Sequence, residues 1–378
     1  MTIYGRWGKH LGPALLVAVV ALFFYASLAS GQTLQDLPPP PPPPKAKPKP
    51  TPTPPPPPKD EDFDVIRTTS NLVMVPVSVV DPSGLPVLGL PLTAFRLDEQ
   101  GREQQITELG NPEQVPLDIV LLFDISSSVS QKGFFLFQQK AAASFLRQVM
   151  KPTDRAAIFT IGEQPLLVSP LASAEVSAAR VQSIPAATTP VPTAFYDTVA
   201  AAAKYLMDNS SEGHRRVILV ISDGDDNFST LVREMTTAEA RASQRGEVTP
   251  ASAKRSLDAR RQRAVMEVQK SVQQADVAFY SINPGGKSVH LNMISTRAQN
   301  AMSMIAESTG GTAYVPDGET DLERVFNEVA AELRGQYLLQ YYSNSQTGGR
   351  EFRTIKVAVP SHAEYRVRAR QGYYPKQK

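Results

Sequence analysis

Three polar segments in the middle of the chain carry the side-chain types of a metal site. They are Asp124–Ser128, Thr188–Thr193 and Ser222–Asn227. Carboxylate and hydroxyl oxygens are hard ligands, and the set includes no histidine or thiol, so it favours a hard divalent cation and disfavours zinc. Carboxylates are fewer than hydroxyls in these segments, which disfavours a Ca²⁺ cage. The set therefore predicts Mg²⁺ that retains water molecules, with Mn²⁺ and Ca²⁺ as alternative ions.

These side chains need a scaffold that brings distant segments of the chain to one edge. Apolar runs at Leu117–Phe123 and Val217–Ser222 directly precede Asp124 and Asp223. Nearly unbroken apolar runs of this length, alternating with helical patterns, predict a parallel sheet that is covered on both faces. Ligands of such sheets bind at the carboxyl ends of the strands, which is where both aspartates fall.

The pattern of strand, helix, strand, helix extends through the middle of the chain. The expected strands are Leu117–Phe123, Ala156–Ile161, Val217–Ser222, Val277–Ile282 and Thr312–Val315. The expected helices are Phe134–Met150, Ala194–Met207, Leu257–Ala275, Ala298–Thr309 and Asp321–Leu333. Gly310 and Gly311 follow the fourth helix. Glycine is common directly after a helix because it readily adopts the left-handed conformation that ends one.

The loops at these strand ends resemble the metal-ion-dependent adhesion site of the von Willebrand factor type A (VWA) family. The matching segments are Phe123–Ser128, Thr193–Asp197 and Ile221–Gly224, in that chain order. The resemblance covers roughly Pro116 to Leu333 and implies an α/β fold with a doubly wound, mostly parallel, Rossmann-like sheet. One departure is Pro192, where many relatives have glycine.

The resemblance also implies a role for each residue of the set. Ser126, Ser128 and Thr193 would coordinate the cation through their hydroxyls, and Asp124 and Asp223 would bind it directly or through water. One metal position would remain for an acidic group of a protein partner.

Short β-like runs flank the α/β pattern on both sides. The expected strands are Leu72–Val80, Phe95–Asp98 and Gln105–Thr107 before it, and Gln336–Tyr342, Glu351–Val359 and Glu364–Arg370 after it. Three strands make a marginal sheet alone, so we expect the two regions to pack together as one small unit like a β-sandwich. Pro76 predicts an edge strand or a bulge, because proline cannot donate to a ladder. The whole arrangement resembles exported bacterial VWFA-related domain proteins.

The first residues of the chain are typical of an export signal. Basic residues precede Leu11–Ala29, which is almost continuously apolar, and small residues follow. This pattern predicts a signal peptide over residues 1–31, with an uncleaved membrane anchor as the alternative, because a helix of this length is about 28 Å long. We expect an exported protein of the periplasm or cell envelope, or a secreted one.

A proline-rich linker is expected over residues 32–61. Pro38–Pro58 contains no apolar side chain larger than alanine, so it cannot form a core. As extended polyproline II it would span about 65 Å and could hold a domain away from a membrane. The other interpretation is an ordinary solvated linker. The remaining predicted divisions are a β unit at 62–113, the VWA domain at 114–334 and closing strands at 335–378.

Composition limits the classes of function. The net charge of +2, from 39 basic and 37 acidic residues, gives no reason to expect nucleic acid. There is no cysteine, which removes disulfides and thiol chemistry. The histidines, His10, His214, His290 and His362, lie outside the predicted metal loops, so no general base is evident for a hydrolase. We expect a protein that is not an enzyme.

The segment between Asn227 and the next expected helix is long and basic. Between Arg241 and Arg263 the acidic residues are only Glu247 and Asp258. One hypothesis is a basic lip beside the cation that attracts an acidic partner; the other is a solvated amphipathic helix. The leading function is therefore a cation-dependent adhesion module that binds a protein. The alternatives are a structural stalk of the cell envelope and, less favoured, a metal-assisted hydrolase.

Overall fold

The central element is a six-stranded, mostly parallel sheet. The computed structural model describes residues 72–126, 135–284, 293–317, 319–344 and 351–375. Within them the sheet has the strand order β10-β9-β8-β5-β6-β7, and only the β6–β7 pair is antiparallel. Its strands are β5 (Leu117–Asp124), β6 (Arg155–Ile161), β7 (Leu166–Ala172), β8 (Arg215–Ile221), β9 (Val277–Ile282) and β10 (Ala313–Tyr314).

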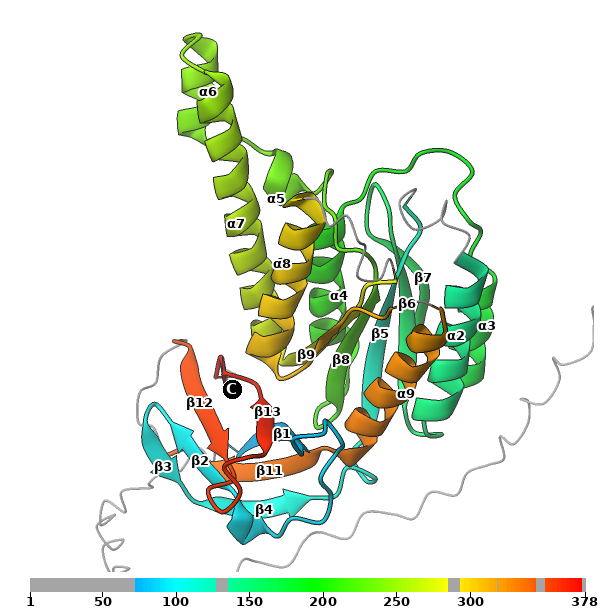
Figure 1. The fold of residues 1–378 in the computed structure, drawn as a ribbon, viewed down its shortest axis with the longest axis vertical. Helices are drawn as coiled ribbons and strands as arrows, with labels where there is room; N and C mark the ends of the chain where they lie inside the picture. Colours follow the sequence, from blue (N-terminus) through cyan, green and yellow to red (C-terminus); the bar gives the residue numbers. More distant parts are fainter. Residues whose placement is uncertain (1–71, 127–134, 285–292, 318, 345–350, 376–378) are drawn as a thin grey trace, which may run out of the picture. The chain divides into compact units, whose positions relative to one another are not determined.

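Helices cover both faces of this sheet (Figure 1). On one face lie α2 (Phe135–Val149), α3 (Ala174–Gln182) and α9 (Glu319–Gly335); on the other lie α4 (Phe195–Asn209), α7 (Pro250–Gln274) and α8 (Met293–Thr309). Alternate residues of β5 enter the two cores, with Leu121 on the first face and Leu122 on the second. Both faces are therefore apolar, as the unbroken run predicted, and the predicted α/β fold is confirmed.

Several elements were not predicted from the sequence. They are β7, α3, α5 (Thr230–Arg233), α6 (Thr237–Gln244) and the first two turns of α7, which begins at Pro250 where the expected helix began at Leu257. The added turns of α7 bury little, so they lack the apolar period on which the prediction depended. Local chemistry starts this helix instead, because Pro250 occupies its first turn and Thr249 and Ser252 form a capping box.

The two flanking β regions pack together, as expected. One sheet has the order β13-β1-β11-β4 and the other β14-β12-β2-β3, so each combines strands from before and after the α/β part. Residues of both sheets, such as Val75, Leu97, Leu339 and Ile355, share one core. The elements are β1 (Leu72–Val80), η1 (Leu92–Ala94), β2 (Arg96–Glu99), β3 (Arg102–Gln104), β4 (Ile106–Gly110), β11 (Tyr337–Tyr342), β12 (Arg353–Ala358), β13 (Arg366–Ala369) and β14 (Gly372–Tyr373).

The expectation that Pro76 marks an edge strand or a bulge is wrong for β1, which lies inside its sheet without a register shift. Pro76 is opposite Leu338 of β11, but β13 pairs with β1 only from Val77 onward. Because no strand pairs with Pro76 on the β13 side, the missing N–H costs no ladder hydrogen bond there.

A buried polar cluster joins the sandwich to the α/β part. Glu332 of α9 accepts hydrogen bonds from Ser78 of β1 (2.9 Å) and from Tyr280 of β9 (3.1 Å), and Arg368 of β13 forms an ion pair with it at 2.6 Å. Tyr314 of β10 also donates to this carboxylate, at 3.3 Å. Four strands of two sheets thus contact a single carboxylate, on a residue that is 6% exposed.

Among the described residues, no helix has both the length and the apolar content needed to cross a membrane. The expected signal or anchor, the proline-rich linker, Ser128 and His290 lie outside the described residues.

Candidate functional site

Asp124 lies at the carboxyl end of β5 and is completely buried. Its Oδ1 accepts a hydrogen bond from the backbone N–H of Ser126 (2.7 Å), and its Oδ2 accepts one from the hydroxyl of Ser222 (2.5 Å). Strand pairing explains the second contact, because β5 and β8 are parallel neighbours with Phe123 opposite Ile221. The next residues, Asp124 and Ser222, therefore leave the sheet side by side.

The loop after β8 turns sharply beside Asp124. The Ser222 hydroxyl accepts a hydrogen bond from the N–H of Gly224 (2.9 Å), and Asp223 between them is half-buried. Gly224 has φ +73°, a left-handed conformation that residues with a Cβ rarely adopt. This turn holds Asp223 close enough to Asp124 for their charges to interact.

Replacement of Gly224 by alanine is expected to cost about 2 to 3 kcal/mol of unfolding free energy. A Cβ would meet the Cε of Met302 at 2.8 Å, in addition to the strain of positive φ. Gly213→Ala is the matched control, because Gly213 has φ +82° with open space around it and should lose only about 1 kcal/mol. Urea denaturation of both variants measures the difference; equal losses would show that Met302 yields without cost.

The third loop ends at Thr193, which is 4% exposed, and is held to the second loop by paired hydrogen bonds. The N–H of Thr193 donates to Asn227 Oδ1 (2.9 Å), and the N–H of Asn227 donates back to Thr193 O (3.1 Å). The N–H of Phe228 also donates to Thr193 O, at 3.0 Å. The position of Thr193 is therefore fixed by the loop that carries Asp223.

Asp226 reinforces this connection at the start of α4. Its carboxylate accepts hydrogen bonds from the N–H groups of Tyr196 (2.9 Å) and Ser229 (3.0 Å) and from the Ser229 hydroxyl. The Ser229 hydroxyl in turn accepts from the N–H of Asp197 (3.0 Å). The first N–H groups of a helix have no partner within it, so a neighbouring loop here supplies the caps that residues preceding α4 do not.

Asp225 and Asp226 follow the Ser222–Gly224 turn, and the sequence favours solvated turn residues at both positions. This interpretation is wrong for Asp226, which is 5% exposed, and Asp225 is half-buried. Burial raises the pKa of both carboxyls, and the charge of Asp223 raises that of Asp225 further. Sequence reasoning also missed the roles of Ser222 and Asn227. A run of small polar residues after an apolar strand was visible, but it does not show which of them turn inward.

The described part of the predicted set lies on three adjacent loops at one edge of the sheet. Asp124 is connected to the Asp223 loop through Ser222, and that loop is connected to Thr193 through Asn227. Ser126 is 1% exposed beside Asp124. The prediction for Ser128 is not tested, since it lies outside the described residues.

The electrostatics of this edge fit a cation. Burial, and after it the negative charge of Asp223, raise the pKa of Asp124 to about 6. A divalent cation between the two carboxylates would offset both effects. Among the described residues no three His, Cys, Asp or Glu side chains form a potential metal cluster, so a cation held by these two aspartates would take its other ligands from hydroxyl or water oxygens. Ser126 and Thr193 are residues of that kind on the adjoining loops.

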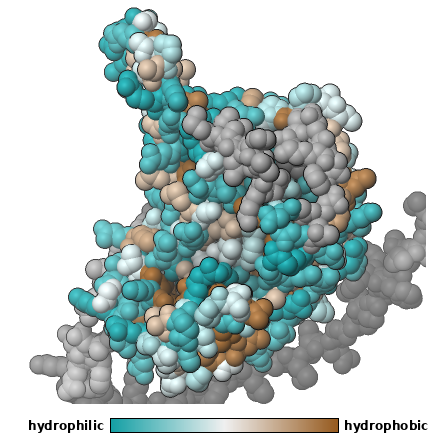
Figure 2. Space-filling model, in the orientation of Figure 1, coloured by the Kyte–Doolittle hydropathy of each residue, from teal (hydrophilic) through white to brown (hydrophobic). Residues whose placement is uncertain are grey.

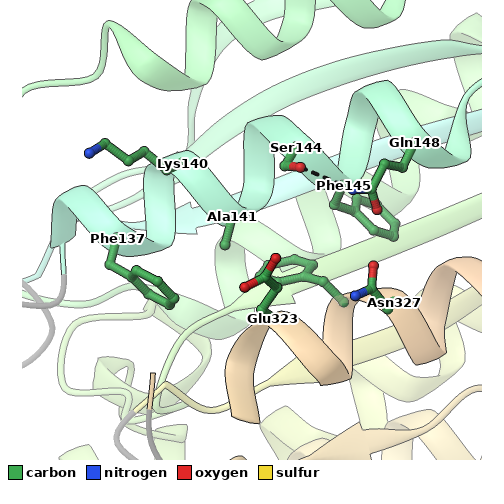
Figure 3. A pocket seen from close by; sticks show the side chains of 9 residues that line it. Phe137, Lys140, Ala141, Ser144, Phe145, Gln148, Glu323 and Asn327 are labelled. Atoms are coloured by element: carbon green, nitrogen blue, oxygen red, sulfur yellow. Dashed lines mark hydrogen bonds between the residues drawn. The ribbon is translucent and has the colours of Figure 1, made fainter. Parts of the chain in front are cut away.

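Other candidate features lie away from this edge. His214 contacts Asp118 (3.1 Å) near the opposite end of β5, and His362 contacts Glu364 (3.0 Å) in the sandwich. A cavity of about 190 Å³ lies between α2 and α9, where Glu323 lies opposite Ala141 and Asn327 lies opposite Gln148 (Figure 3). None of the described residues of the predicted metal set lines it.

Comparisons with known proteins point to one family. The family model of the von Willebrand factor type A domain matches residues 118–328. None of the curated proteins compared with the chain matches it.

Similar solved structures include an aerotolerance-related membrane protein from Bacteroides fragilis with multiple mutations to serines, at 17% identity, covering 57% of this chain and 98% of that one, with a TM-score of 0.35. The vWF domain of the type V pili tip protein Mfa5 from Porphyromonas gingivalis has 13% identity, coverage of 57% and 94%, and a TM-score of 0.41. Proximal thread matrix protein 1 from the mussel byssus, with a zinc-occupied MIDAS motif, has 13% identity, coverage of 60% and 50%, and a TM-score of 0.38.

Proposed function

The chain belongs to the von Willebrand factor type A family, and from this premise we propose that it is an exported, cation-dependent adhesion module. In this proposal Asp124, Ser126, Ser128, Thr193 and Asp223 hold Mg²⁺, and the bound ion engages an acidic group of a protein partner. The observation that carries the proposal is the buried Asp124 carboxylate, which faces a second carboxylate at the edge where three hydroxyl-bearing loops meet.

The proposal assigns separate tasks to the residues. Asp124 and Asp223 supply negative charge, directly or through water, and the hydroxyls of Ser126, Ser128 and Thr193 supply neutral oxygens. When bound, Mg²⁺ would supply a coordination position that a carboxylate of the partner can occupy. Ser222 orients Asp124 through a hydrogen bond. Asn227 and Asp226 accept hydrogen bonds from Thr193 and Tyr196, and so hold the Thr193 loop against the Asp223 loop.

The proposal also includes the parts of the chain before the sandwich. A signal peptide or anchor at residues 1–31 and a proline-rich linker at 32–61 would place the module outside the cytoplasm, at the end of a spacer. The boundaries at 62–113, 114–334 and 335–378 belong to the same proposal. The similarity to exported bacterial VWFA-related proteins supports this arrangement.

Thr193→Val is expected to weaken Mg²⁺ and Mn²⁺ binding at least tenfold, because it removes one hydroxyl ligand and keeps the shape of the side chain. Thr198→Val is the matched control. Thr198 is also buried, but its hydroxyl donates to Ala194 O (2.7 Å) within α4. Isothermal titration calorimetry on chelator-treated protein measures both affinities. Equal affinities in the two variants would remove Thr193 from the site.

The adhesion function is tested by affinity capture from an envelope extract, in Mg²⁺ and in EDTA. A partner that is lost both in EDTA and with Thr193→Val, but retained with Thr198→Val, supports the proposal. A partner that is retained in EDTA favours the structural stalk, in which the cation stabilises the protein without contacting the partner.

A further inference from the structure

The basic residues between Arg241 and Arg263 are not equivalent in the folded protein. Arg260 is half-buried; it donates to Val232 O (2.8 Å) and forms an ion pair with Glu239 at 2.9 Å, so it holds α5 and α6 against α7. Arg245 pairs with Glu247 at 3.0 Å on the surface. The hypothesis of a uniformly basic lip is therefore wrong for these two arginines, which have partners within the chain.

Arg261 occupies a different position on α7. Helical spacing places Arg261 on the same stripe as Ala264, Val265 and Val268, three, four and seven residues later. Those three residues are buried in the core that α7 shares with α4 and α8. Arg261 itself is half-buried, so it lies on the inward face of α7 at the level where the helix leaves the core.

Two further contacts fix the rotation of α7 at this level. Asp258, three residues before Arg261, pairs with Arg297 of α8 at 3.1 Å, and Arg260 faces α5. Arg261 lies between these directions, on the face of α7 that packs against α4. It is level with the first turn of α4, because α5, which Arg260 contacts, is hydrogen-bonded to that turn from Thr230 N–H to Asp197 (2.8 Å). A positive charge is thus placed beside the loop of the proposed metal site.

The face of α7 that carries Arg261 continues toward the N-terminus of the helix, beyond the buried core. Lys254 is seven residues before Arg261, so it lies on the same face of α7 about 10 Å further along the helix. It is exposed, and α6 together with the N-terminal part of α7 extends beyond the ends of the strands (Figure 1). The surface of this projection is largely hydrophilic (Figure 2).

We infer that Lys254 and Arg261 form a basic ledge that makes a second contact with the acidic partner. This inference rests on the proposed function: one carboxylate of the partner binds the cation, and further acidic groups nearby meet the ledge. The preferred partner surface is then an acidic cluster, because a single carboxylate could satisfy only the metal. Charges placed this way favour both encounter and register of a complex.

The probe for this inference is a fluorescein-labelled peptide of ten aspartates, with binding followed by anisotropy in Mg²⁺ and in EDTA. Arg261→Gln is expected to weaken the Mg²⁺-dependent binding about three- to tenfold, and Lys254→Gln less, because exposed ion pairs contribute little each. Arg261→Lys should restore most of the affinity. Arg263→Gln is the matched control, since Arg263 is exposed and lies on the far side of the same helix; it should change the affinity less than about twofold.

The outcomes separate the ledge from the metal site. Equal affinities of Arg261→Gln and Arg263→Gln, with Mg²⁺ dependence intact, would overturn the ledge and leave the proposed function standing. Loss of affinity in Arg261→Gln that Arg261→Lys does not restore would also overturn it, because the effect would then be structural. If the unaltered protein binds the peptide equally in Mg²⁺ and in EDTA, the proposed function itself is wrong.

Discussion

Asp124→Asn is expected to abolish Mg²⁺ binding and, at the same time, to stabilise the metal-free protein at pH 7. The folded pKa of Asp124, about 6, is above its unfolded value of 3.8 because of burial and the charge of Asp223. The folded state then binds more protons than the unfolded state between these values, so stability falls as pH rises from about 4 to 6. At pH 7 the ionised carboxylate therefore lowers the free energy of unfolding by about 2 to 3 kcal/mol. The neutral amide of the variant avoids this loss.

Asp118→Asn provides a control on the same strand with the opposite sign. Asp118 is also fully buried, and burial alone would raise its pKa, but hydrogen bonds from Arg155, Ser210 and His214 outweigh that effect and hold the pKa below its usual value. Its ionised form is therefore favoured in the folded state, and the amide should lower stability at pH 7.

Thermal unfolding with EDTA and with Mg²⁺ measures both variants. The unaltered protein should gain stability with Mg²⁺, since the ion binds only the folded state, and Asp124→Asn should not respond. If Asp124→Asn melts well below the unaltered protein in EDTA, the carboxylate stabilises the metal-free fold and the electrostatic argument for a cation fails.

Glu332→Ala is expected to produce the largest loss of stability, about 3 to 5 kcal/mol. It leaves the Arg368 guanidinium and the hydroxyls of Ser78, Tyr280 and Tyr314 without their common acceptor. Removing one member of a buried ion pair is costly because the other remains desolvated. Glu332→Gln should lose less, since an amide oxygen still accepts hydrogen bonds.

The matched control for this prediction is Glu328→Ala, one turn earlier on α9. Glu328 pairs with Arg324 on the surface, so its removal should cost less than about 0.5 kcal/mol. Urea denaturation followed by circular dichroism gives both values. Because Glu332 joins the sandwich to the α/β part, its loss should also let the two parts unfold separately, so that the single unfolding transition becomes two. If Glu332→Ala loses less than about 1 kcal/mol of unfolding free energy and still unfolds in a single transition, the cluster does not stabilise the protein.

The sequence by itself determined the strands and helices whose apolar residues repeat in a regular pattern. The apolar runs of β5 and β8 predicted two buried strands of one parallel sheet, which explains why Asp124 and Asp223 share an edge. The structure added that the two strands are direct neighbours, so that Ser222 contacts Asp124. Helix periods predicted α2, α4, α8 and α9 to within a few residues at most ends, because each buries one continuous apolar face. The core of the sandwich was predicted because neither β region could bury its apolar residues alone.

Only the tertiary structure decided which polar residues have partners. Asp226 and Asp225 are adjacent in the sequence, yet Asp226 caps α4, while Asp225 is half-buried and has its pKa raised by burial and by the charge of Asp223. Arg260 and Arg261 are adjacent too, yet Arg260 forms an ion pair with Glu239 of α6, whereas Arg261 lies on the face of α7 that packs against α4. Glu332 finds its partners on strands far away in the sequence. Apolar burial follows a residue's own type and period, whereas the partner of a charge depends on which distant segment the completed fold places beside it.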